Sequence, residues 1–106
     1  MTFNLKQNDT SPNIQAQLLD GDGFPIDVSQ ATVRFHVRNA EGTVIIDEPA
    51  VILVGTDGTV EYGWDAADTA TAGTYQGEFE VTYESGKIET FPNASYIEIV
   101  ITDDIA

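Results

Sequence analysis

Hydrophobic and polar residues alternate most regularly over residues 73–84. The apolar or small members of this pattern are Tyr75, Gly77, Phe79, Val81 and Tyr83. Apolar side chains at every second position are typical of a β-strand with one buried and one exposed face. Ser85-Gly-Lys87 has the composition of a turn, and residues 88–92 continue as a second arm. The stretch therefore predicts a β-hairpin at the centre of the fold.

Shorter apolar segments separated by Gly, Asp, Asn and Pro predict further strands before and after this hairpin. We expect them near residues 3–7, 14–19, 32–38, 43–47, 59–64 and 96–101, with a short extended piece at 24–28. Residues 50–54 are continuously apolar, which predicts a strand covered on both faces or a short core strand. Trp64 is the largest expected core side chain.

The order of these elements predicts an all-β fold. Asp65 is a suitable N-cap for one or two helical turns near residues 65–72, the one short helical segment expected. About 7–8 short strands with turns between them indicate an immunoglobulin-like antiparallel β-sandwich. The length of 106 residues predicts a single domain over residues 1–106.

Net charge narrows the possible partners. The chain carries 18 acidic residues against four lysines and arginines, a formal charge of −14. Nucleic acids and anionic membranes are not expected as partners, because both require basic surfaces. The acidity indicates either a halophilic host, whose salt screens the repulsion, or a basic partner, and we favour the host. No cysteine, export signal or membrane-spanning segment is visible in the sequence.

Three potentially cationic side chains share the outer face of the predicted strand 32–38. Arg34, His36 and Arg38 alternate there with apolar residues. This row is the candidate interface, able to dock the carboxylates of a partner. The simpler interpretation, which we favour, is cross-strand pairing with Glu78 and Glu80 if the two strands are neighbours. His36 has no second ligand or nucleophile in a recognisable frame, so a surface position is expected.

No sequence motif predicts catalysis, a cofactor or a metal site. The segment Asp20-Gly-Asp-Gly23 lacks the further oxygen ligands of a calcium loop, so we interpret it as a hairpin turn. Glu78 and Glu80 should lie solvated on an open sheet face, which gives no cleft for acid–base chemistry. We therefore expect no enzyme activity.

Five segments, in this order, resemble the N-terminal domain of tailed-phage baseplate upper proteins. They cover residues 6–12, 18–25, 27–38, 64–75 and 78–92. The resemblance implies a small β-sandwich of the virion that tethers receptor-binding fibres to the baseplate, without catalytic residues. Family members continue into a fibre-bearing region, whereas this chain stops at Ala106.

The expected function is therefore a structural one in a tailed virus. We expect an assembly or connector module of the baseplate or tail tip, located in the virion and bound to other virion proteins in several copies or as a homo-oligomer. The alternatives are a capsid decoration protein and a carbohydrate-binding or adhesive surface domain. Few rings are left to stack on sugar, because the alternation places most aromatic residues inward.

Overall fold

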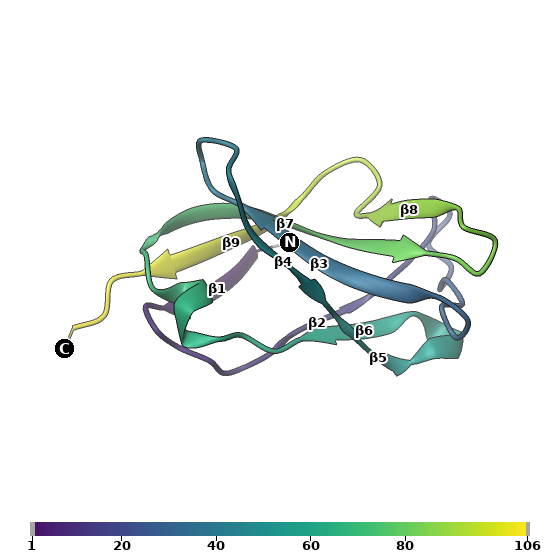
Figure 1. Ribbon diagram of the computed structural model, residues 1–106, viewed down its shortest axis with the longest axis horizontal. Helices are drawn as coiled ribbons and strands as arrows, with labels where there is room; N and C mark the ends of the chain where they lie inside the picture. Colours follow the sequence, from purple (N-terminus) through teal and green to yellow (C-terminus); the bar gives the residue numbers. More distant parts are fainter. Residues whose placement is uncertain (1, 106) are drawn as a thin grey trace.

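The computed structural model describes residues 2–105 and has two β-sheets with two short 3-10 turns (Figure 1). No helix in this part of the chain is long and apolar enough to span a membrane. The elements, in chain order, are β1 (Thr2–Lys6), β2 (Ile14–Gln17), β3 (Thr32–Arg38), β4 (Val44–Pro49), β5 (Val51–Val54), η1 (Gly55–Asp57), β6 (Thr59–Tyr62), η2 (Ala66–Thr69), β7 (Gly73–Thr82), β8 (Ile88–Phe91) and β9 (Ile97–Thr102).

The larger sheet has the strand order β1-β9-β7-β3-β4, with β8 also paired to β7, and the smaller sheet has the order β2-β6-β5. The predicted all-β sandwich is confirmed. Neighbouring strands are antiparallel except β1 and β9, which are parallel and pair Phe3 with Ile99. A parallel pair requires a long connection, and these two strands lie at opposite ends of the sequence.

Strand β7 is the spine of the larger sheet, as its regular pattern predicts. It pairs with β3 along one side, and with β9 and then β8 along the other. Tyr75, Phe79 and Val81 are buried, and Phe79 lies opposite Phe35 of β3. The predicted hairpin is therefore the β7–β8 pair, closed through a turn in which Gly86 donates to the carbonyl of Tyr83.

An aromatic cluster joins the two sheets. The Phe35 ring stacks on Tyr62 of the smaller sheet at a centroid distance of 4.8 Å and meets the edge of Trp64 at 5.7 Å. The Trp64 indole donates a hydrogen bond to the carbonyl of Pro12 at 3.1 Å, so its polar atom is satisfied inside the core. Trp64 is thus the core anchor that the sequence predicts.

The helical segment expected at residues 65–72 is the single turn η2. Its first turn is held by Asp68, whose Oδ2 accepts hydrogen bonds from the Asp65 amide at 2.9 Å and from the Tyr62 hydroxyl at 2.6 Å. Thr69 is fully buried, and its hydroxyl donates to the carbonyl of Asp9 at 2.9 Å. These contacts fasten the turn to the sandwich, although it is too short to be stable alone.

Strands β4 and β5 form one continuous path that crosses from the edge of the larger sheet to the edge of the smaller sheet (Figure 1). The prediction of a covered or core strand at residues 50–54 is wrong. Val51, Leu53 and Val54 are 57%, 43% and 46% exposed. The reason is that β5 lies at a sheet edge, and a register shift against β6 between Ile52 and Val54 leaves two successive residues outside the core.

Candidate functional site

The outer face of β3 carries the predicted row, and all three of its residues are half-buried between β7 and β4. In the β3–β7 register, Arg34 lies opposite Glu80, His36 opposite Glu78 and Arg38 opposite Gln76. The condition for cross-strand pairing, that these strands are neighbours, is therefore met.

Arg34 does not pair with Glu80 and instead contacts the other neighbouring strand. Its Nε donates to Asp47 Oδ1 at 2.8 Å, and a terminal amino group donates to the Asp47 carbonyl at 2.7 Å. Two hydrogen bonds from one guanidinium to the same residue of β4 stabilise this arrangement more than a single contact with Glu80 on β7 would. The Arg34 hydrogen bond holds the pKa of the Asp47 carboxyl below its ordinary value. The expected Arg34–glutamate pair is thus corrected to Arg34–Asp47.

His36 lies between two carboxylates. Its Nε2 is 3.2 Å from Asp47 Oδ1, and its Nδ1 is 3.2 Å from Glu78 Oε2. The predicted contact between the row and Glu78 is therefore present. The imidazole thus links β4, β3 and β7 on the sheet surface.

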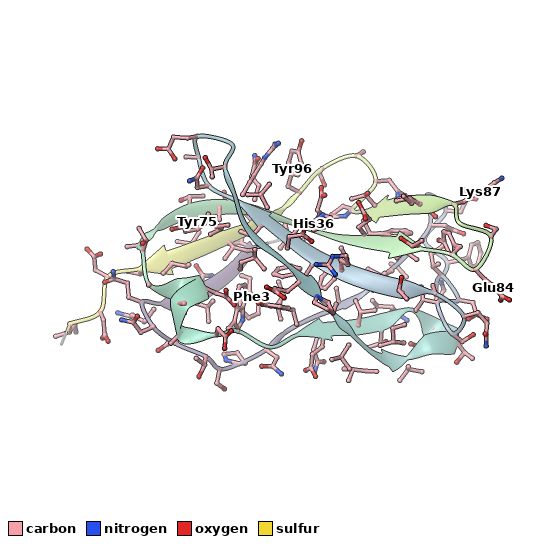
Figure 2. The ribbon with its side chains drawn as sticks, viewed as in Figure 1. Phe3, His36, Tyr75, Glu84, Lys87 and Tyr96 are labelled. Carbon is pink, nitrogen blue, oxygen red and sulfur yellow. The ribbon has the colours of Figure 1, made fainter. Side chains whose placement is uncertain are left out.

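Arg38 lies at the end of the row beside an exposed aromatic ring. Its Nε donates to Gln76 Oε1 at 2.7 Å, and its guanidinium carbon is 4.7 Å from the centroid of the Tyr96 ring. Tyr96 is 46% exposed and precedes β9, so its predicted place in the closing strand is wrong. Figure 2 shows Tyr96 and His36 as labelled side chains of this region. Val44 completes the apolar lining of the shallow hollow beside Arg38.

The segment Asp20-Gly-Asp-Gly23 forms the predicted turn. Asp20 Oδ1 accepts hydrogen bonds from the amides of Asp22 at 2.9 Å and Phe24 at 3.0 Å, and the chain reverses so that Leu19 pairs with Pro25. The extended piece expected at residues 24–28 forms this bridge, and its Ile26 and Val28 amides donate to the carbonyls of Leu18 and Gly55. Within residues 2–105 there is no group of three or more His, Asp or Glu side chains arranged to hold a metal ion.

The aromatic residues that a sugar-binding surface would require are mostly inside the protein. Tyr62, Trp64, Tyr75 and Phe79 are all buried, as the alternation predicts, and Tyr83 is half-buried. The Tyr83 hydroxyl donates to Glu89 at 2.7 Å, and burial raises the pKa of Tyr83 to about 12. The inward orientation of these rings therefore disfavours a stacking platform for carbohydrate.

Sequence reasoning missed two exposed features, the Arg38–Tyr96 contact and the apolar edge of β5. The first joins residues 58 positions apart and has no local signal. The apolar edge had a signal in the sequence, because residues 50–54 form an uncharged run in a very acidic chain. Whether that run is exposed depends on which strand lies at the sheet edge, which the sequence does not show.

Comparisons with known proteins agree with this architecture. A search of curated proteins found no match. Among solved structures, the chain is similar to the N-terminal domain of phage TP901-1 ORF48, with a TM-score of 0.71, 17% identity, and coverage of 96% of this chain and 85% of that one. It is also similar to CopC from Methylosinus trichosporium OB3b, with a TM-score of 0.58, 10% identity, and coverage of 99% and 87%. At these identities the likeness concerns the fold.

The family comparison is more specific than the fold. The family model of the BppU N-terminal domain matches residues 2–100, which includes every segment on which the sequence resemblance depends. The resemblance is thereby confirmed, and the chain belongs to the BppU N-terminal domain family, the N-terminal domains of phage baseplate upper proteins.

Proposed function

We propose that this chain is a non-enzymatic structural part of a tailed-virus particle, an assembly or connector module that joins other proteins of the baseplate or tail tip. The observation that carries the proposal is the family match over residues 2–100. A stable sandwich with free strand edges suits such a role, because edges and loops can bind partners without rearrangement of the core.

The module would act in several copies, since virion parts are arranged about symmetry axes. Within it, the row Arg34, His36 and Arg38 remains a predicted contact surface. Arg38 is the most available member, because its hydrogen bond to Gln76 uses Nε and its terminal amino groups donate no hydrogen bond to the described residues. These donors could meet a carboxylate of a partner protein.

The test is particle association. Purified virions are analysed by mass spectrometry and labelled with an antibody to this chain for electron microscopy. The proposal expects the chain in the particles and the label at the tail tip. Label distributed over the head would replace it with capsid decoration, and a chain missing from particles that contain the other tail proteins would refute it.

We also propose that the net charge of −14 is an adaptation to a salt-rich host. Screening at molar salt shortens the range of charge repulsion to about 3 Å, which makes a crowded acidic surface tolerable. The dependence of stability on salt, described in the Discussion, tests this.

A further inference from the structure

The free edges of the two sheets differ in chemistry. Exposed edge strands commonly carry charges or proline, which discourage pairing with other chains. Strand β4 has Asp47, Glu48 and Pro49, β1 has Lys6, and the exposed side chains of β2 include two glutamines. Strand β5 has the sequence Val-Ile-Leu-Val, with neither charge nor proline. The β5 edge therefore lacks the usual protection.

Strand β5 is also open to a partner. Within residues 2–105 it pairs with β6 alone, so its other side has no strand beside it. The exposed apolar residues of this edge are Val51, Leu53 and Val54, and we call them the β5 strip. Three exposed apolar side chains within one four-residue edge strand, on a chain of charge −14, indicate a contact site, since leaving them in water costs free energy.

Acidic residues surround the β5 strip. Asp47 and Glu48 precede it in the chain, Asp57 follows it in η1, and Glu61 of β6 lies opposite Val51. The strands of the smaller sheet carry no lysine or arginine, and Arg34 of the larger sheet is already hydrogen-bonded to Asp47. An apolar strip inside a negative field best fits an apolar segment that carries positive charges at its ends.

We propose that the β5 edge docks an extended segment of another protein, with alternating apolar side chains and basic flanking residues, which adds as a fourth strand to the smaller sheet. That this partner is a virion protein rests on the proposed function. A second copy of the chain fits less well, because antiparallel pairing centred between residues 52 and 53 would bring Glu48 toward Asp57 at both ends.

The probe is a synthetic peptide in which valine and threonine alternate between two lysines at each end. Binding is followed by NMR chemical-shift changes in the isotope-labelled chain. We expect saturable changes at residues 51–54 and on β6. A peptide with proline at its centre and one with glutamate flanks should each bind about tenfold more weakly or worse, because they lack the strand conformation or the charge.

Leu53→Lys should weaken binding about tenfold or more, because it places a like charge in the path of the peptide. The matched control is Ile88→Lys, since Ile88 is a strand residue that is 62% exposed on β8. Its affinity should stay within about twofold of the native value. Val51→Thr should also weaken binding. Because threonine is β-branched like valine and favours a strand, this variant tests the apolar contact even if the lysine variant fails to fold.

Several outcomes would overturn the inference. The first is that the peptide changes NMR chemical shifts at β1, β2 or β4 instead of β5. The second is that Leu53→Lys and Ile88→Lys lose the same amount of affinity for the peptide, and the third is that the peptide does not bind at all. Dimerisation of the free chain that Leu53→Lys abolishes would assign the edge to a second copy. If particles contain the chain but accept Leu53→Lys as readily as the native form, the docking edge is wrong while the proposed function stands.

Discussion

Gly58 is the position where one added methyl group should be most damaging. It follows η1 in the tight connection from β5 to β6, with a left-handed φ of +73°. A Cβ at this position would lie 2.6 Å from the carbonyl oxygen of Ile26 and 2.9 Å from that of Leu18. Both are backbone atoms, so Gly58→Ala can be accommodated only by moving the chain.

The expected loss has two parts. A left-handed alanine costs about 1–2 kcal/mol relative to glycine. Displacing two backbone segments adds about 1–3 kcal/mol, as overpacking does in cores. Moving these segments would strain two backbone hydrogen bonds. The Leu18 amide donates to the carbonyl of Gly58 at 2.8 Å, and the Ile26 amide donates to the carbonyl of Leu18 at 2.9 Å. We therefore expect Gly58→Ala to lower the free energy of unfolding by about 2–5 kcal/mol.

Gly42→Ala is the matched control. Gly42 also has a left-handed φ, +86°, but apart from its chain neighbours no described atom lies within 4 Å of the position that an added methyl group would take. Gly42→Ala should therefore lower the free energy of unfolding only by the cost of the left-handed conformation, about 1–2 kcal/mol. Urea unfolding, followed by the fluorescence of the buried Trp64, measures both variants. Equal losses for the two variants, with unchanged m-values, would refute the argument from backbone contact.

Three further predictions concern electrostatics. Arg34→Ala should raise the pKa of the Asp47 carboxyl toward its ordinary value, because the variant removes the hydrogen bond that lowers it. The stability that this carboxylate provides at neutral pH, and that is lost as pH falls, should decrease in the variant. NMR titration of the carboxyl with an unchanged pKa would contradict this. Burial and the hydrogen bond to Asp68 raise the pKa of Tyr62 well above its ordinary value, so the free energy of unfolding should fall as pH rises above about 10. Tyr62→Phe should lessen that fall and should cost about 1 kcal/mol of stability at pH 7, because the hydrogen bond is lost. Identical urea midpoints for the variant and the native protein at each pH would count against this. The melting temperature should rise between about 0.1 M and molar NaCl if the acidity is an adaptation to salt, whereas a constant or falling value would oppose that origin.

The sequence alone determined the local features of this fold. Alternation in β3 and β7 placed Val33 and Phe35 on one side and Arg34 and His36 on the other, because successive side chains of any strand point to opposite faces. Turn chemistry located the reversal after Asp20, whose side chain accepts hydrogen bonds from the amides of Asp22 and Phe24. These features depend on neighbouring residues, so the sequence is sufficient to predict them.

Features set by which strands lie side by side required the tertiary structure. Arg34 faces acids on both neighbouring strands. The β3–β4 register places Pro49 opposite Arg34 and leaves Asp47 diagonally across from it, where the two side chains form their hydrogen bond. The apolar run of β5 has the same pattern whether it lies inside a sheet or at an edge, and only the strand order shows that it lies at an edge. Strand order depends on contacts between residues far apart in the chain, and no local periodicity encodes them.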